Sequence, residues 1–370
     1  MNNPMLFRSF KPTLVLAVAT SCLTACGQFL YVGTTAPAVE IFDIRDAGNV
    51  QQMLRKPSVS LPDSIGAPSA MTVVDKSLYL AGGSSVIAQY DIDSSTGALT
   101  LRGTVPTGSP PYSMARLGQS LYVGAFGSND VRIYSIATNG ALASQQTVPA
   151  AGINSLHTDS TAGKFLFTGH RSAGAGSPQL CSHTVLANGS LNMAPACVAV
   201  PGAPTSMQSA SGVLFVLFNA TVPPNPGNSN FVSAWSIDQA TGVLSKRGND
   251  LDIGAANVGQ LAISTNGQTL FLPRQGNFTL VGTANPLTAS AASFQNTMSQ
   301  FCLVPPAAGY QVAVNPNGKA MYLTDTANVT LGTITGRRIA AIDLTGGSPL
   351  KPIICEATGA IPQSIAIFAQ

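Results

Sequence analysis

The sequence predicts an all-β protein, a seven-bladed propeller of four-stranded antiparallel blades. An apolar triplet recurs seven times along the chain at intervals of 43 to 56 residues, a spacing typical of such blades. Between the triplets, alternating stretches are separated by Asn-Gly or Thr-Gly turns, as in β-hairpins. These triplets, called anchors below, are Leu30-Tyr31-Val32, Leu78-Tyr79-Leu80, Leu121-Tyr122-Val123, Phe165-Leu166-Phe167, Leu214-Phe215-Val216, Leu270-Phe271-Leu272 and Met321-Tyr322-Leu323.

The first 25 residues are expected to be a targeting segment. Arg8 and Lys11 form a basic start, and the apolar run that follows is too short to span a bilayer. The run ends in Leu23-Thr24-Ala25-Cys26-Gly27, which resembles the lipobox of bacterial lipoproteins. The resemblance implies cleavage before Cys26, a lipid anchor on its thiol and, from Gly27, an outer-membrane location in the cell envelope. An ordinary secretory signal or a chance cysteine is the alternative.

Residues 26–370 are expected to form a single propeller domain, and residues 77–100 show one blade most clearly. The anchor at Leu78 is followed by alternation over residues 86–92 and by the Thr96-Gly97 turn into Leu99. This pattern predicts two half-buried strands joined by a hairpin. A Gly- or Pro-opened segment of small residues precedes each later anchor and suits the crowded centre of a propeller. The predicted order within a blade is inner strand, anchor strand, third strand and outer strand.

The two ends of the chain predict how the ring closes. Residues 364–368 follow the last blade as one more apolar inner strand, whereas the first anchor has no inner strand before it. We expect the C-terminal strand to pair with the N-terminal one, because this removes two exposed sheet edges.

Four cysteines remain beyond the targeting segment and Cys26. Cys181 and Cys197 lie eight residues on either side of Gly189, and Asn188-Gly189 predicts a tight hairpin turn between them. We therefore expect a Cys181–Cys197 disulfide and, by elimination, a Cys302–Cys355 disulfide. Free buried thiols are the alternative.

Composition argues against several classes of function. Charged residues make up 9% of the chain, the net charge is +3, and no basic run is longer than Arg337-Arg338, so we expect no nucleic-acid partner. The sequence has no phosphate-binding Gly-Lys-Ser/Thr loop, and no cofactor is expected. The three histidines, His157, His170 and His183, fall on different predicted strands, so no metal site is expected either.

The repeat, a Leu-Tyr-Val-like strand followed by an Ile-Asp...Thr-Gly-x-Leu turn, resembles the seven-bladed lactonase family, which includes 6-phosphogluconolactonases. The resemblance implies lactone hydrolysis by a histidine, a glutamate and arginines on the loop-rich face. Arg274 matches one of those arginines. Asn154 stands at the histidine position, Asn219 or Ala220 at the glutamate position, and Thr205 near another arginine. The aligned positions therefore lack a base and an acid.

Candidate site residues gather on the face where the anchor strands end. A neutral imidazole can accept a proton near pH 7, so His170 beside Arg171 is the best substitute base, with Arg274 as the stabilising cation. Tyr112, Phe126 and Trp235 are expected aromatic residues of a neutral binding surface. Further expected ligand-binding residues are Tyr112, Asn154, Thr205, Asn219, Gln311 and Asp325.

Two functions follow from this pattern. The first is an envelope-anchored propeller that binds a small molecule, a glycan or a protein on its loop-rich face. The alternative is a hydrolase of sugar or organic-acid lactones, which predicts that His170, Arg171 and Arg274 converge on one pocket. A scaffold role in the envelope would instead predict an exposed apolar patch.

Overall fold

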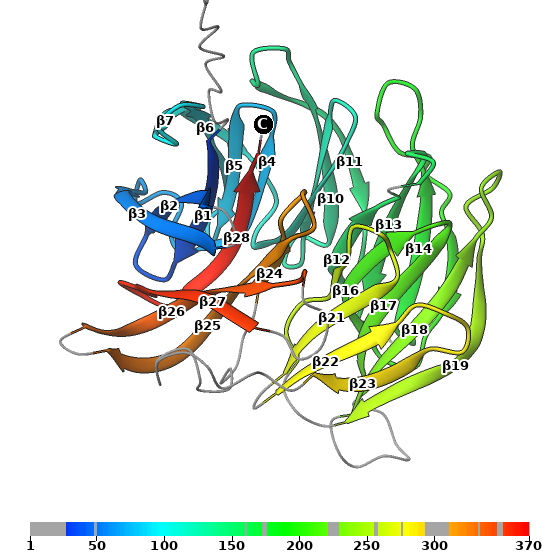
Figure 1. The fold of residues 1–370 in the computed structure, drawn as a ribbon. Coiled ribbons are helices and arrows are strands. Elements are labelled where there is room, and N and C mark those ends of the chain that lie inside the picture. The colour runs from blue at the N-terminus through cyan, green and yellow to red at the C-terminus, as the bar shows by residue number, and fades with distance from the viewer. Residues whose placement is uncertain are drawn as a thin grey trace, which may run out of the picture.

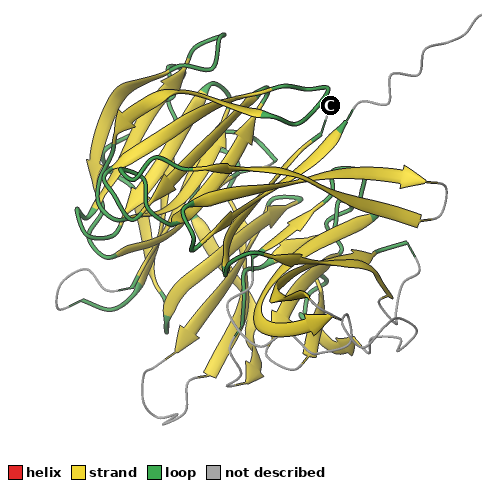
Figure 2. Ribbon diagram, turned by 90° about the vertical axis from the view of Figure 1, so that its left-hand side faces the viewer, coloured by secondary structure: helices red, strands yellow, loops and turns green. Residues whose placement is uncertain are grey.

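The structure is a computed structural model that describes residues 27–47, 50–159, 161–171, 176–220, 229–254, 258–274, 277–292, 311–331, 334–345 and 351–369. Every regular element in these ranges is a strand (Figure 2). The strands form seven four-stranded antiparallel sheets arranged as the blades of a propeller, which confirms the predicted fold. Within the same ranges, no helix has the length and apolar character needed to cross a bilayer.

Each blade starts with an inner strand at the propeller axis, followed by an anchor strand. The inner strands of blades 1 to 7 are β28 (Pro362–Phe368), β4 (Pro68–Val74), β8 (Pro111–Leu117), β12 (Ile153–Thr158), β16 (Ala203–Ala210), β20 (Ala262–Ile263) and β24 (Val312–Val314). The anchor strands, in the same order, are β1 (Gln28–Thr34), β5 (Ser77–Gly82), β9 (Ser120–Ala125), β13 (Phe165–His170), β17 (Val213–Ala220), β21 (Thr269–Arg274) and β25 (Ala320–Leu331).

A third strand and an outer strand complete each blade. The third strands are β2 (Ala38–Ala47), β6 (Val86–Ile92), β10 (Asp130–Ile136), β14 (Gln179–Thr184), β18 (Ser229–Ile237), β22 (Asn277–Gly282) and β26 (Ile334–Asp343). The outer strands are β3 (Val50–Ser60), β7 (Leu99–Pro106), β11 (Leu142–Pro149), β15 (Ala196–Ala199), β19 (Leu244–Gly254), β23 (Thr288–Ala292) and β27 (Lys351–Thr358).

The ring closes in blade 1, where the two ends of the chain meet. The C-terminal strand β28 pairs antiparallel with β1, so that Phe29 lies opposite Phe368 and Val32 lies opposite Ile365. In Figure 1 the red β28 lies beside the dark blue β1. This pairing confirms the closure predicted from the sequence.

The apolar core lies in the seams between neighbouring blades. Along an anchor strand, successive side chains point to opposite faces of the sheet and so enter two different seams. In blade 2, Leu78 packs into the seam with blade 1, whereas Tyr79 packs into the seam with blade 3. Every residue of β5 is buried, because both faces of this strand are covered.

In blade 4 the anchor triplet of the sequence is out of register by one residue: Leu166, and not Phe165, corresponds to Leu78 of blade 2. Leu166 packs toward blade 3, as Leu78 packs toward the preceding blade, and Phe167 packs toward blade 5. Phe167 therefore takes the place that Tyr79 has in blade 2. Three consecutive apolar residues with interchangeable sizes do not reveal this one-residue difference in register.

The meander gives the propeller two distinct faces. On the mouth face, inner strands begin and anchor strands end; on the turn face, inner strands end and anchor strands begin. Third and outer strands are joined on the turn face, for example by the turn of Asp93 to Gly97.

One predicted disulfide is present within the described residues. Cys181 and Cys197 lie opposite each other in β14 and β15 and form a disulfide, as expected from the hairpin. Cys355 is also disulfide-bonded. Its expected partner, Cys302, lies outside the described residues, as does Cys26, so the second pairing and the lipidation stay predictions.

Candidate functional site

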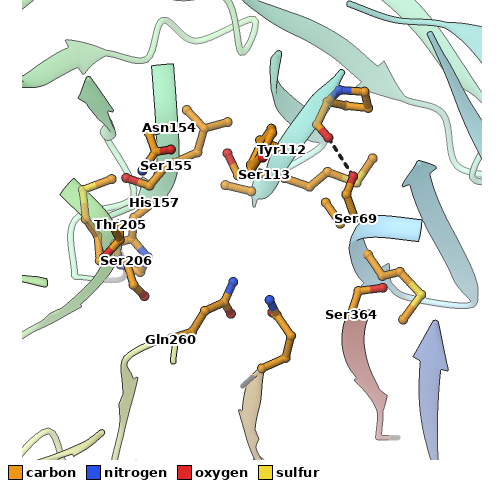
Figure 3. Close-up of a pocket in the computed structure, with 18 of the residues that line it drawn as sticks. Ser69, Tyr112, Ser113, Asn154, Ser155, His157, Thr205, Ser206, Gln260 and Ser364 are labelled. Carbon is orange, nitrogen blue, oxygen red and sulfur yellow. Dashed lines mark hydrogen bonds between the residues drawn. The ribbon is translucent and has the colours of Figure 1, made fainter. Parts of the chain in front are cut away.

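A cavity of about 790 Å³ lies on the propeller axis and is bounded mainly by the mouth-side ends of the inner strands. Figure 3 shows polar side chains around one open space, with Asn154 and His157 on one side and Ser69 and Ser364 on another. The inner strands place these residues there because they form the edge of each blade that lies nearest the axis.

The cavity lining is polar but almost uncharged. Arg171 is the one permanently charged residue among the described residues that line it, and no carboxylate is among them. Its amide and hydroxyl groups come from Ser69, Tyr112, Ser113, Asn154, Ser155, Thr158, Thr205, Ser206, Gln208, Gln260, Gln311, Gln363 and Ser364. Amides and hydroxyls both donate and accept hydrogen bonds, so this lining matches ligands that do the same.

Four residues form a cluster at the edge of the cavity, called the rim cluster below: Tyr112, Phe126, Asn154 and Arg171. The Nε of Arg171 donates a 3.0 Å hydrogen bond to Oδ1 of Asn154, and its guanidinium carbon lies 5.3 Å from the centre of the Phe126 ring. Tyr112 meets the same ring edge-on at 6.0 Å and is 51% exposed. A cation on an aromatic face is held in place without being neutralised.

Asn154 links the rim cluster to the scaffold. Its Nδ2 donates a 2.8 Å hydrogen bond to the carbonyl oxygen of Pro204 in the neighbouring blade. The backbone N–H of Arg171 donates to the carbonyl oxygen of Gly152 at 2.9 Å. Groups from blades 3, 4 and 5 therefore position the guanidinium, and its two terminal amino groups make no hydrogen bond to any described residue.

His157 is a cavity residue that the sequence analysis did not select. It lies in β12, and its Nε2 is 2.9 Å from Oγ of Ser209. Burial lowers the pKa of His157 to about 4, so its imidazole is neutral at pH 7. With Gln208, it also lines a second cavity of about 550 Å³ on the turn face. In the sequence, His157 resembles a structural residue because it lies within an alternating inner strand. Only the structure shows that its side chain lines the axial cavity.

His170 does not reach the cavity, contrary to the expectation from its place at an anchor end. Its side chain is buried within blade 4, where Nε2 hydrogen-bonds with Oγ1 of Thr168 at 2.7 Å and Nδ1 with the carbonyl oxygen of Ala151 at 2.9 Å. The same threonine hydroxyl lies 3.2 Å from Nε2 of His183. Burial lowers the pKa of His170. Only its neighbour Arg171 faces the cavity.

Arg274 also lies away from the cavity lining. It is the last residue of β21 and pairs with Asn277 of β22, and its backbone bridges to Val258. Its Nη1 donates a long, 3.4 Å hydrogen bond to Oγ1 of Thr279, while its buried Nε has no partner among the described residues. Of His170, Arg171 and Arg274, which the hydrolase alternative requires to converge, only Arg171 therefore lines the axial cavity.

The other expected binding residues separate into two groups. Tyr112, Asn154, Thr205 and Gln311 all line the axial cavity, as their positions near inner-strand starts predict. Asn219 does not: its Nδ2 donates a 3.2 Å hydrogen bond to Oδ1 of Asn230 in the adjacent strand.

Two further expectations concern Asp325 and Trp235. Asp325 pairs through its backbone with Arg338, and its side chain lies outside the described part of the structure. The surface role expected for Trp235 is wrong, because this side chain is buried between blades 4 and 5 and its Nε1 donates to Oγ of Ser233.

Metal binding finds no support in the described ranges. They contain no group of three or more histidine, cysteine, aspartate or glutamate residues placed to hold an ion.

Residues 29–164 match the sequence model of the family described as lactonase, 7-bladed beta-propeller. A comparison with curated proteins gave no match. Among solved structures, a Bacteroides fragilis protein proposed to be a 6-phosphogluconolactonase is similar, with 16% identity, a TM-score of 0.69, and coverage of 94% of this chain and 99% of that one. The periplasmic gluconolactonase PpgL of Pseudomonas aeruginosa gives 13% identity, a TM-score of 0.66, and coverage of 93% and 99%.

The fold alone does not decide the activity. Hydrazine synthase of Kuenenia stuttgartiensis is also similar, with 14% identity, a TM-score of 0.59, and coverage of 82% of this chain and 92% of that one. Proteins described as lactonases and as a hydrazine synthase thus share similar folds, so function must be argued from the site. The chain is a seven-bladed β-propeller, and its residues 29–164 carry the sequence signature of the lactonase family.

Proposed function

We propose that this protein is an envelope-anchored propeller that binds a small hydroxyl-rich ligand, a sugar or sugar acid, in the axial cavity at the rim cluster. One observation carries the proposal: a cavity of about 790 Å³ is lined by amides and hydroxyls, and the one permanent charge among its described lining residues is the guanidinium of Arg171. The volume is in the range of small-molecule sites in proteins.

The chemistry of the lining favours this class of ligand. A sugar presents hydroxyl groups that both donate and accept, which serine, threonine, asparagine and glutamine side chains can match. The apolar face of a sugar ring can pack against an exposed aromatic residue such as Tyr112. A carboxylate on the ligand would pair with the free amino groups of Arg171, whose fork fits two carboxylate oxygens. A polyanion would find one cation, Arg171, among the described residues of the lining.

Lactone hydrolysis is the second candidate, favoured by the family match and by the presence of His157 and Arg171 in one cavity. In this reaction neutral His157 would take a proton from water as the water oxygen bonds to the lactone carbonyl carbon. Arg171 would stabilise the resulting oxyanion. Collapse would break the ring carbon–oxygen bond, and the leaving alkoxide would take back the proton to give the open hydroxy acid.

The anchor part of the proposal rests on the lipobox-like segment Leu23-Thr24-Ala25-Cys26-Gly27. Acyl chains on Cys26 would hold the protein at the membrane. The substitution Cys26→Ser should shift the full chain from the membrane fraction to the soluble periplasmic fraction. Equal membrane retention of both forms would contradict the anchor.

Calorimetric titration of the full chain with neutral sugars, aldonic acids and aldonolactones tests the ligand class. We expect saturable binding that Arg171→Gln weakens most for the acids and that Arg274→Gln, the matched control, leaves unchanged. Absence of binding by every compound, or equal losses in both variants, would contradict the proposal. Acid release from the lactones, lost in His157→Gln but with binding retained, would establish the hydrolase instead.

A further inference from the structure

The point at which the chain enters the fold indicates which face of the anchored propeller is turned to the membrane. The anchor strand β1 begins on the turn face, where a Cβ placed on Gly27 would lie 3.4 Å from the carbonyl oxygen of Ser94 in a turn of blade 2. Asn315, in a turn of blade 7 on the same face, donates a 2.9 Å hydrogen bond from Nδ2 to Oε1 of Gln28. The entry point therefore lies on the turn face, close to blade 2 and hydrogen-bonded to blade 7.

Cys26 directly precedes this entry point. Consecutive Cα atoms lie only about 3.8 Å apart, so acyl chains on Cys26 would start within one residue of the turn face. A tether this short leaves the propeller little freedom to turn its other face to the bilayer.

A second, independent feature of the same face is its exposed apolar residues. Six large hydrophobic side chains among the described residues are exposed, and three of them lie in turns of this face: Leu186 at 48%, Met193 at 57% and Val243 at 46%. Leu186 and Met193 belong to the β14–β15 connection of blade 4, and Val243 to the β18–β19 turn of blade 5. Blade 4 lies across the ring from the tether in blade 1.

We infer that the turn face rests on the bilayer that holds the acyl chains, with the Leu186, Met193 and Val243 side chains at its surface and the cavity mouth directed away from the membrane. The inference rests on the proposed lipid anchor. The lipid anchor on blade 1 and the exposed apolar residues in the turns of blades 4 and 5 would contact the bilayer at two separate places. Two contacts on opposite sides of a rigid ring fix its orientation.

Charge on this face is mixed and does not favour an electrostatic contact. Exposed Lys76, Arg116, Lys164 and Lys319 are accompanied by exposed Asp75, Asp93 and Asp238. The expected contact is therefore mainly apolar and less sensitive to salt than the binding of a basic patch to anionic lipids.

The orientation has a consequence for the ligand. Inner strands such as β4 have seven residues and rise about 3.3 Å per residue, so the rim cluster would stand roughly 20 Å from the turn face. Ligands would reach Tyr112 and Arg171 from the aqueous phase and not from the lipid.

The test uses the full lipidated chain in phosphatidylcholine vesicles that contain brominated lipid, which quenches nearby tryptophan. The protein has a single tryptophan, the buried Trp235, which sets the background. We expect the added fluorescence of Met193→Trp, and independently of Leu186→Trp, to be largely lost in these vesicles. The added fluorescence of Tyr112→Trp should persist and be quenched by aqueous iodide.

The reverse pattern, with Tyr112→Trp quenched by lipid and both turn-face variants open to iodide, would overturn the orientation while leaving the anchor intact. Equal exposure of all three tryptophans to iodide would overturn it as well. If the Cys26→Ser form partitions like the wild type, the anchor itself fails, and the orientation fails with it.

Discussion

The hydroxyl of Tyr79 in blade 2 donates a 2.7 Å hydrogen bond to the carbonyl oxygen of Gly140, in the β10–β11 turn of blade 3. Both groups are buried in the seam. The bond recurs in two neighbouring seams, from Tyr31 to the carbonyl oxygen of Gly97 at 3.0 Å and from Tyr122 to that of Gly189 at 2.7 Å. The central tyrosine of the anchor triplet therefore links each of these blades to the hairpin turn of the next.

Removal of one such hydroxyl should destabilise the propeller. In Tyr79→Phe the buried carbonyl oxygen of Gly140 loses its partner, which costs about 1–3 kcal/mol in the free energy of unfolding. Tyr112→Phe is the matched control, because Tyr112 is half exposed at the rim and should change stability little. Chemical unfolding of both variants measures the difference. Equal stabilities would show that the seam hydrogen bond contributes nothing.

The repeated hairpin turns were predictable from sequence, and so were the strands on either side of them. An Asn-Gly or Thr-Gly turn fixes its own conformation locally, and burial on both faces makes each anchor a continuous apolar run. Residue types alone do not specify the direction of a side chain at a strand end. Arg171 and Arg274 both lie at or just beyond the end of an anchor strand, yet one faces the axis and the other packs against its own hairpin.

The hairpin glycines should also be sensitive to substitution. Gly242 has φ +76°, and an added Cβ would lie 2.6 Å from the ring of Phe165 in the preceding blade. Gly118 has φ +56°, but a Cβ added to Gly118 would lie in open space. Gly118→Ala should therefore cost only backbone strain, about 1–2 kcal/mol, and Gly242→Ala should cost about 1–3 kcal/mol more from overpacking. Thermal unfolding compares the two, and equal losses would contradict the contact.

The disulfide of blade 4 should stabilise its outer edge. Cys181 and Cys197 are separated by 16 residues, and closing a loop of this length contributes about 3 kcal/mol. The double substitution Cys181→Ala/Cys197→Ala should lower the free energy of unfolding by that order. The wild type kept in oxidising buffer is the reference. An unchanged unfolding midpoint would mean that the β14–β15 pairing holds the edge without the bond.

Buried histidines should make the propeller sensitive to mild acid. Burial, aided by the nearby His170, lowers the pKa of His183 to about 4, against about 6.5 in the unfolded chain. Between these values the unfolded chain binds more protons than the folded one, so stability is full above pH 6.5 and falls as the pH drops toward 4, by about 3 kcal/mol for this group.

His183→Gln should reduce that dependence. The measurement is the free energy of unfolding of wild type and variant at several pH values between 4 and 7. The wild type should lose more stability than the variant over this range, with His157, whose pKa is lowered in the same direction, still contributing in both. Parallel curves would mean that His183 titrates alike in the folded and unfolded chains.

The ring of Phe126 should matter for ligand binding more than for stability. It lies beneath the guanidinium of Arg171 and against Tyr112, so Phe126→Leu frees both side chains of the rim cluster. A cation–π contact at an exposed site contributes about 0.5–1 kcal/mol, and ligand affinity should fall about two- to fivefold if that contact positions the guanidinium.

Phe231→Leu is the matched control, because Phe231 stacks on Phe218 in a seam and lies outside the cavity lining. The control should lose stability while its affinity stays at the wild-type value. Calorimetric titration and unfolding on the same samples separate the two effects, and equal affinities in both variants would mean that Arg171 needs no aromatic support.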